Sequence, residues 1–470
     1  MVKEYKGAYS GEHGDGLVRS EWIAPFFGPR LTAALGEIKS WLDPKGLMNP
    51  GKIVNPSRMD DKSLFRFKPG YKTVPPDSRL DWSEWGGFDK AVEMCNNNGH
   101  CRKFDAGTMC PSYRATRDET HLTRGRANTL RLALSNQLGE EGEQAVRDAL
   151  DLCVSCKGCK RECPTGVDMA RMKVEFNAHY KAKHGFTARD KAVAYLPRYA
   201  PWAARLAPVT NLVTSLTKGA LGFARRDLPK WRSDVFSDEG TSEGDVVLFV
   251  DTFNRYFEPE NAHAAMKVLE AAGHRVYAPR GLCCGRTFLS AGMVDRAKAE
   301  ARKMLDALAP FAGKPIVGLE PSCLFSLRDE LPAMGFGQLA ASAQLFEEFL
   351  ARNPGKLKLR EMKREVLLHG HCHQKAFDAM PAVEKVLGMV PGLRVSTVQT
   401  SCCGMAGSFG YEAEHYDVSL KMAELSLLPS IRNSPQALVV ADGTSCRHQI
   451  ADGTGRKPVH VARLLADALP

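Results

Sequence analysis

Four closely spaced cysteines constrain this 470-residue chain more than any other feature. Their spacing, C-x2-C-x2-C-x3-C-P, runs from Cys153 through Cys156 and Cys159 to Cys163-Pro164. In this spacing three thiolates bind one [4Fe–4S] cluster, and the cysteine before the proline reaches a second cluster. A four-thiolate zinc site is the alternative, but zinc sites usually use two separated C-x2-C pairs. The spacing therefore predicts a chain that transfers electrons.

A second cysteine group lies upstream, with Cys95, Cys101 and Cys110-Pro111. If each cysteine before a proline crosses to the other cluster, one cluster receives four ligands, Cys110, Cys153, Cys156 and Cys159. The other receives only Cys95, Cys101 and Cys163. This set predicts a [3Fe–4S] centre, or a [4Fe–4S] cluster whose fourth position is open or not a cysteine. Residues 88–185 would then form an all-α domain that binds two clusters.

The remaining composition is that of an ordinary globular chain. Apolar residues make up 44% and charged residues 25% of it, and no run of about eighteen uncharged apolar residues predicts a transmembrane helix. Fourteen cysteines without a secretory signal indicate metal sites in a reducing compartment rather than disulfides. We therefore expect a cytoplasmic protein, or one bound peripherally to the inner face of the cytoplasmic membrane.

The net charge of +10 does not indicate nucleic-acid binding, because lysines and arginines are spread along the chain without interleaved aromatic residues. A basic surface suits an anionic substrate, a redox partner or an anionic membrane. The stretch 186–243 has proline-interrupted apolar segments flanked by Arg198, Arg205, Lys218, Arg225 and Arg226. It is either a helical connector that covers the cluster domain or a membrane-surface element that brings the clusters to a quinone.

Residues 245–470 contain an internal duplication, with repeats over 245–335 and 364–470. Strand-like runs alternate with helical segments, which predicts parallel α/β units whose ligands lie where strands end. Both repeats have two vicinal cysteines before a glycine, Cys283-Cys284-Gly285 and Cys402-Cys403-Gly404, and further loop cysteines at Cys323, Cys372 and Cys446. Seven loop cysteines in register predict metal or cluster ligands, and buried free thiols are the alternative.

Residues 1–56 are too few to bury an independent core. They contain the loop Ser10-Gly11-Glu12-His13-Gly14-Asp15-Gly16, a helical segment from Trp22 to Trp41, and a turn-rich tail from Asp43 to Lys52. The loop G-E-H-G-x-G followed by L-D-P-x-G-x-x-N-P-G-K resembles the last segment of the FAD-linked D-2-hydroxy-acid dehydrogenases (D-lactate, glycolate and D-2-hydroxyglutarate types). The proline- and glycine-punctuated residues 57–87 are expected to form a linker.

This resemblance implies roles for two residues. Glu12 would bind a divalent metal that holds the hydroxy acid, and His13 would take the hydroxyl proton while hydride goes to the flavin. No G-x-G-x-x-G follows a strand in the chain, so FAD would come from an upstream domain of a longer fused protein or from a partner flavoprotein. A glycine-rich surface loop with an inactive histidine is the alternative.

The doubled cysteine pattern is similar to the cysteine-rich CCG domain of heterodisulfide reductase subunits, glycolate oxidase iron–sulfur subunits and lactate-utilisation proteins. There the motif holds a non-cubane iron–sulfur centre or a zinc ion, which implies a metal at Cys372, Cys402, Cys403 and Cys446. The first repeat offers only Cys283, Cys284 and Cys323, with Phe253-Asn254 about where a His-Cys-His run would stand. We expect that repeat to be degenerate.

These features predict an α+β chain: an FAD-linked oxidase remnant over 1–56, an all-α ferredoxin-like domain over 88–185, a basic connector over 186–243, and a duplicated α/β domain over 245–470. The resemblance implies the electron-transfer part of a flavin-dependent D-2-hydroxy-acid dehydrogenase, which passes electrons from reduced FAD through clusters to a quinone or other acceptor. Two other functions stay open. One is a heterodisulfide-reductase-like component that acts on thiols or disulfides, and the other is a ferredoxin-like adaptor without substrate chemistry.

Overall fold

The computed structural model describes residues 1–10, 12–105 and 107–470, which divide into two compact units, Met1–Lys72 and Thr73–Pro470. The first unit contains the helices α1 (Gly16–Ser20), α2 (Ile23–Phe27) and α3 (Pro29–Leu42). Gly28 has a positive φ of 82° and separates α2 from α3, so the helical segment expected from Trp22 to Trp41 is interrupted. Among the described residues of this unit only Ser20, Ile23 and Asp43 are buried, which is too little for a hydrophobic core.

The second unit begins with a purely helical region. Its helices are α4 (Phe88–Glu93), α5 (Pro111–Thr116), α6 (Thr123–Leu134), α7 (Gly142–Asp151), α8 (Gly158–Glu162) and α9 (Met169–His184). The last part of the linker expected over 57–87 packs against this helical region, because Leu80 and Trp82 are buried. The Glu175 carboxylate accepts hydrogen bonds from the Leu80 N–H and the Trp82 indole N–H, both at 2.9 Å.

The basic connector is helical over its first half, with α10 (Ala188–Ala194), α11 (Leu196–Arg205) and α12 (Ala207–Thr217). Pro197 and Pro208 lie in the first turns of α11 and α12, where a missing N–H costs no hydrogen bond. Within the described residues, no helix is long and apolar enough to cross a membrane.

The two repeats form two parallel sheets. The first has the order β2-β1-β3-β4, with β1 (Val246–Phe249), β2 (Val276–Tyr277), β3 (Ile316–Gly318) and β4 (Ala343–Leu345). The second has the order β6-β5-β7, with β5 (Arg364–Leu368), β6 (Leu393–Thr397) and β7 (Leu438–Val440). The mixture of helices and parallel strands agrees with the expected α+β class, although β4 was not expected.

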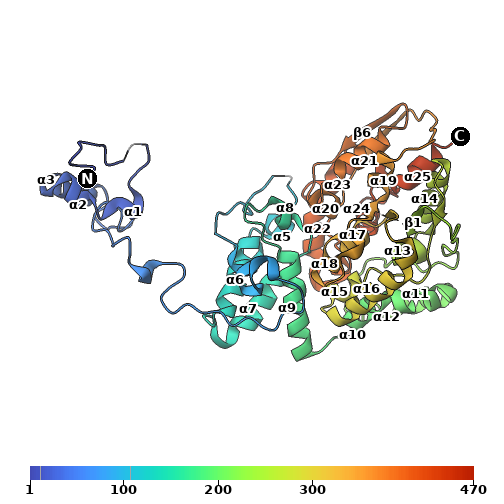
Figure 1. Cartoon of the computed structure of the whole chain (residues 1–470), viewed down its shortest axis with the longest axis horizontal. Helices are drawn as coiled ribbons and strands as arrows, with labels where there is room; N and C mark the ends of the chain where they lie inside the picture. Colours follow the sequence, from blue (N-terminus) through green and yellow to red (C-terminus); the bar gives the residue numbers. More distant parts are fainter. Residues whose placement is uncertain (11, 106) are drawn as a thin grey trace. The chain divides into compact units, whose positions relative to one another are not determined.

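Helices surround both sheets (Figure 1). The first repeat has α13 (Thr252–Tyr256), α14 (Pro259–Ala271), α15 (Arg286–Ser290), α16 (Val294–Leu308), α17 (Pro321–Arg328), α18 (Glu330–Ala333) and α19 (Phe346–Arg352). The second has α20 (Cys372–Ala376), α21 (Met380–Leu387), α22 (Tyr416–Glu424), α23 (Leu427–Arg432), α24 (Thr444–Thr454) and α25 (Val461–Asp467). The α8 and α5 helices of the cluster region pack against α20 and α22, so the cluster region sits directly on the second repeat.

Candidate functional site

Four of the predicted cluster ligands meet around one small cavity. Cys110 directly precedes α5, and Cys153, Cys156 and Cys159 belong to residues 153–163, which we call the cluster loop; all four line the cavity. Burial raises the pKa of the Cys110, Cys156 and Cys159 thiols. Thiolates are therefore costly here unless a cation compensates them, and this donor set fits an iron–sulfur cluster.

The backbone of the cluster loop explains how three sulfurs share one cavity. Ser155 and Lys157 lie between the cysteines and have positive φ angles of 48° and 60°. Each two-residue spacer therefore turns back toward the cavity. A Cβ on Gly158 would lie 2.9 Å from the Met109 backbone nitrogen, so the loop approaches residue 109 where only glycine fits.

The second predicted set is only partly assembled. Cys95 and Cys101 are buried, and burial, with Cys110 and Cys95 nearby, raises the pKa of Cys101 to about 11. Cys163 lies at the end of α8, with its Sγ 3.3 Å from the Thr165 hydroxyl. That Cys163 joins Cys95 and Cys101 at one cluster stays a prediction.

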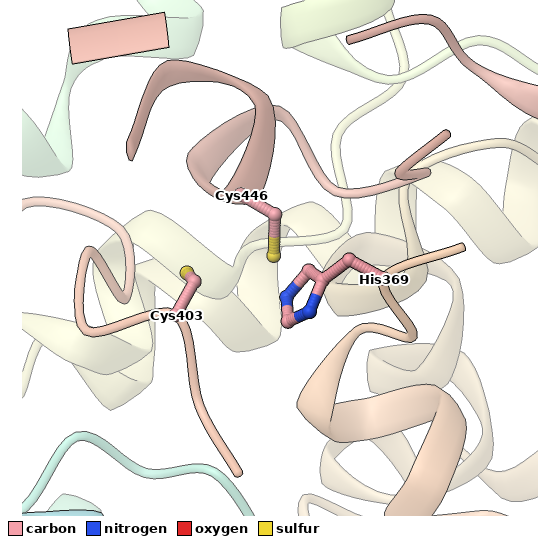
Figure 2. A group of neighbouring side chains, drawn as sticks. All are labelled: His369, Cys403 and Cys446. Carbon is pink, nitrogen blue, oxygen red and sulfur yellow. The ribbon is translucent and has the colours of Figure 1, made fainter. Parts of the chain in front are cut away.

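A second metal-like centre lies in the second repeat. Cys372 begins α20, Cys402 and Cys403 follow β6, and Cys446 lies in the first turn of α24; all four thiols are buried. One ligand atom each from Cys403, Cys446 and His369 lie within 4.8 Å of one another. Figure 2 shows these three side chains converging from three separate segments.

His369 is the ligand that the sequence did not single out. Its Nδ1 lies 3.1 Å from the Thr400 hydroxyl, and its buried Nε2 has no hydrogen-bond partner within the described structure. A buried, unpaired nitrogen beside two thiols fits a metal ion, which would complete its bonding. The signal was present in the sequence as the run His369-Gly370-His371-Cys372-His373 directly after β5.

The electrostatics of this centre favour thiolates at Cys372 and Cys403, whose pKa values are lowered, whereas the pKa values of Cys402 and Cys446 are raised. The Cys402 thiol, and then His371, hold the pKa of Cys372 well below its ordinary value. Burial opposes charge on His371, but Cys372 outweighs burial and raises the pKa of His371 to about 9. A Cβ on Gly443 would lie 2.4 Å from the His371 ring and 3.3 Å from the Cys446 Sγ, so glycine leaves this space to the ligands. The donor set thus fits a soft metal such as zinc or iron.

The first repeat holds fewer ligands at the same place. Cys283, Cys284 and Cys323 are buried, and Cys284 interacts with the other two thiols. Phe249 pairs with Gly318 as Leu368 pairs with Val440, and Asp251 precedes α13 as His371 precedes α20. The helix starts therefore set Asp251-Thr252 against His371-Cys372, whereas the strand register, which matches residue 249 to residue 368, sets Phe253 against Cys372.

The cluster loop touches the second centre directly. Burial raises the pKa of the Cys156 thiol, and Cys372, its strongest charged neighbour, raises it further. One residue away on each segment, the His373 Nε2 lies 3.1 Å from the Ser155 carbonyl oxygen. Val154 and Cys156 share a hydrophobic cluster with Cys372, Cys402 and Cys403. The two candidate redox centres are therefore neighbours.

A larger cavity of about 270 Å³ opens beside the cluster loop. Cys153 and Ser155 form part of its wall, with charged side chains from α9 and the segment before α22. The Lys173 ammonium donates to the Cys153 carbonyl at 2.7 Å, and burial lowers the pKa of Lys173. The cavity can admit a small molecule next to a cluster ligand.

Glu12 and His13 lie in the first unit. The His13 Nε2 is 3.9 Å from a Glu12 carboxylate oxygen, and both side chains are more than four-fifths exposed. The two groups are therefore adjacent, and both are exposed on the surface of this unit.

Three protein families match parts of the chain. Residues 1–53 match the C-terminal domain of FAD linked oxidases, and residues 91–167 match the 4Fe-4S dicluster domain. Residues 247–328 and 366–451 each match the cysteine-rich CCG domain. All three families are those to which the sequence motifs point.

Similar proteins combine these parts. The chain is 27% identical to D-2-hydroxyglutarate dehydrogenase of Escherichia coli (strain K12) over 98% of its own length and 51% of that protein. It is 29% identical to one of the subunits of the anaerobic glycerol-3-phosphate dehydrogenase of the same organism, over 56% of this chain and 72% of the relative. It is 23% identical to a probable glycolate oxidase iron-sulfur subunit of Bacillus subtilis (strain 168), over 76% of this chain and 91% of the relative.

The chain spans about half the length of the D-2-hydroxyglutarate dehydrogenases that it matches. The matches cover its FAD-oxidase segment, its dicluster region and both CCG repeats in one order. Part by part, the chain is therefore similar to the FAD-linked D-2-hydroxy-acid dehydrogenases and to related iron–sulfur subunits.

Proposed function

We propose that this chain is the iron–sulfur electron-transfer part of a flavin-dependent D-2-hydroxy-acid dehydrogenase, with D-2-hydroxyglutarate as the favoured substrate. The relatives that align with nearly the whole chain bear the name D-2-hydroxyglutarate dehydrogenase. D-lactate and glycolate remain the other candidate substrates. The partner is a flavoprotein, or an FAD-binding domain in a longer chain, and the acceptor is a quinone or another oxidant that contacts the protein at a membrane.

The contact between the cluster loop and the second CCG repeat is the observation that supports this function best. Cys156 and Cys372 are neighbours, and His373 bonds to Ser155. Adjacent ligands of two centres give electrons a short path between them.

The ligand assignment follows the geometry and the sequence. Cys110, Cys153, Cys156 and Cys159 would hold a [4Fe–4S] cluster. Cys95, Cys101 and Cys163 would hold a second cluster that is one cysteine short. Cys372, Cys402, Cys403, Cys446 and His369 would hold a non-cubane iron–sulfur centre or zinc, and Cys283, Cys284 and Cys323 form a degenerate counterpart. Bound clusters supply one-electron steps that follow the two-electron reduction of a flavin.

Glu12 and His13 are assigned to the substrate side by resemblance. Glu12 would bind a divalent metal that orients the hydroxy acid, and His13 would accept the hydroxyl proton. Their exposure in the first unit agrees with a half-site that a flavin-binding domain completes. The domain divisions of 1–56, 88–185, 186–243 and 245–470 form part of the same proposal.

We assign the acceptor to the cavity beside Cys153. Its wall includes a backbone-bonded lysine, Lys173, and the Arg286 guanidinium, whose nearest carboxylate, Glu330, is 3.5 Å away. Both cations can donate hydrogen bonds to a carbonyl oxygen. A quinone ring would thereby lie next to a cluster ligand.

A reconstitution experiment tests the function. The anaerobically purified chain is mixed with a flavoprotein of the D-2-hydroxy-acid dehydrogenase type, and cluster absorbance is followed after adding D- or L-2-hydroxyglutarate. We expect bleaching with the D-enantiomer only. Cys372→Ser should slow reduction of an added dye without preventing bleaching of the dicluster region, and the matched variant Cys283→Ser should change neither.

Other outcomes would favour the alternatives. Bleaching by thiol or disulfide couples alone would assign the chain to the heterodisulfide-reductase-like class. Reduction by any protein donor, independent of hydroxy acids, would make it an adaptor. Either result contradicts the proposed function.

A further inference from the structure

The helices α11 and α12 expose a row of large apolar side chains. Trp202 is 67% exposed and Leu216 76% exposed, and the members of the row follow one another at intervals of one to four residues. They are Trp202, Leu206, Val209, Leu212, Val213 and Leu216. Single exposed apolar residues are ordinary, but a contiguous row of six is a candidate contact surface.

These two helices bury small side chains and expose large apolar ones. Small residues, Ala200, Ala203 and Ala207, are buried against Trp231 and Phe257. The Asn211 amide anchors α12 through hydrogen bonds of 2.9 Å and 2.8 Å with the backbone of Trp231. The helices are thus fixed to the protein by alanines and an amide, while their larger apolar side chains point away from its core.

The charged residues within this segment are all basic. Residues 191–226 contain no aspartate or glutamate, and their charged residues are Lys191, Arg198, Arg205, Lys218, Arg225 and Arg226. Arg226 is buried and Arg198 pairs with Glu300, whereas Lys191, Arg205 and Arg225 are exposed. The Arg205 guanidinium lies 5.6 Å from the centre of the Trp202 ring. Apolar side chains with a basic border and an interfacial tryptophan suit the boundary between lipid headgroups and acyl chains.

We propose that the α11–α12 face docks on an anionic lipid surface, with its apolar row inserted and its cations against phosphate headgroups. Charge selects this occupant, because an acid-free segment is attracted by a negatively charged membrane. The helices would lie in the plane of the interface, since no described helix can span it. This inference extends the membrane contact of the proposed function. Vesicle binding needs neither flavoprotein nor substrate, so its failure would leave the electron-transfer proposal standing.

Vesicle flotation tests the proposal with the full chain purified anaerobically. Vesicles contain either phosphatidylcholine alone or phosphatidylcholine with phosphatidylglycerol, at low and high salt. We expect binding to the anionic vesicles, weakened by salt because the headgroup attraction is screened. The double variant Leu212→Asp/Leu216→Asp should lower the affinity about tenfold or more, since each leucine loses its transfer into the acyl region.

Ser215→Asp is the matched control, because Ser215 is exposed on the same turn of α12 but outside the apolar row. It adds a negative charge beside Leu216 and should reduce binding only about as much as one lost charge predicts. Unchanged cluster absorbance in all variants would show that they fold.

Three results would overturn the proposal. They are absence of binding by the unmodified chain, equal binding to neutral vesicles, and equal loss in the double variant and in Ser215→Asp. Light scattering that shows self-association, abolished by Leu212→Asp/Leu216→Asp, would assign the face to a second copy of the chain instead.

Discussion

His369 is the side chain whose surroundings most require a ligand. Its ring is buried, one nitrogen lies near the Thr400 hydroxyl, and the other has no partner among the residues described. Leaving a buried polar atom unpaired costs about 1–3 kcal/mol. The Cys403 and Cys446 thiols beside that nitrogen supply the other donors of a metal site.

Metal content should report this site. We expect Cys403→Ser to remove the metal of the second repeat, and His369→Ala to weaken its binding about tenfold or more. Metal analysis of purified variants checks both. Cys284→Ser removes an equally buried thiol of the first repeat and should leave the zinc and iron content unchanged; a similar loss there would show that both repeats bind metal.

His415 provides a pH-dependent link between the cluster region and the second repeat. Its two nitrogens lie 2.9 Å from the carboxylates of Asp151 and Glu412. Burial alone would lower the pKa of His415, but these two hydrogen bonds raise it to about 9.

The sign of the effect follows from that shift. The pKa of His415 in the folded protein exceeds its unfolded value. The interaction of His415 with the two carboxylates therefore stabilises the protein fully below the unfolded pKa, and this stabilisation is lost as the pH rises through about 9. We expect His415→Gln to lower the free energy of unfolding by about 2 kcal/mol at neutral pH, a value reduced because Asp151 is partly exposed. Denaturant titration at neutral and alkaline pH checks it: the difference should shrink above about pH 9, and a constant difference would contradict the link.

At the scale of elements, the cluster loop is locked to the first repeat by Lys157. This lysine is 2% exposed, and its ammonium lies 2.5 Å from carboxylate oxygens of Asp329 and Glu330, beside α18. Burial opposes the charge, but these carboxylates outweigh it and raise the pKa of Lys157. The loop that holds three cluster cysteines is therefore also a docking element.

Removing that cation should be costly. Lys157→Met removes the buried cation that the two acids share, and leaves Asp329 with Lys160 at 2.5 Å and Glu330 with Arg286 at 3.5 Å. We expect the free energy of unfolding to fall by about 2 kcal/mol. Arg161→Met is the control from the same loop, since Arg161 pairs with Asp378 at 2.9 Å but both are exposed. It should cost less than about 1 kcal/mol. Chemical denaturation of both variants would contradict the locking role if their losses were equal.

At the scale of the whole molecule, the described chain consists of two compact units, and all fourteen cysteines, the candidate cluster and metal ligands, lie in the second. A chain that begins at Thr73 should therefore keep its iron and acid-labile sulfide. It should lose reduction by D-2-hydroxyglutarate plus flavoprotein, because Glu12 and His13 are removed. The full chain with His13→Gln should lose the same reaction with unchanged iron content; retained activity in either form would remove the first unit from the substrate site.

Sequence reasoning was strongest where chemistry depends on spacing. The C-x2-C-x2-C-x3-C-P run and the duplication are visible in a linear sequence, because ligand spacing and strand alternation are local properties. Breaks inside elements were harder to foresee. Gly28, with its positive φ of 82°, interrupts the helix expected from Trp22 to Trp41. Backbone conformation at one residue decides such breaks.

By itself, the sequence determined the cysteine groups, the two α/β repeats and the families that the parts of the chain resemble. Only the tertiary structure brought His369 to Cys403 and Cys446, set Cys156 beside Cys372, and showed Lys157 buried between acids. It also decided that α11 and α12 turn alanines inward and leucines outward. The reason is physical: local spacing fixes which atoms can bind a metal, but long-range packing decides which segments meet and which faces remain in contact with solvent.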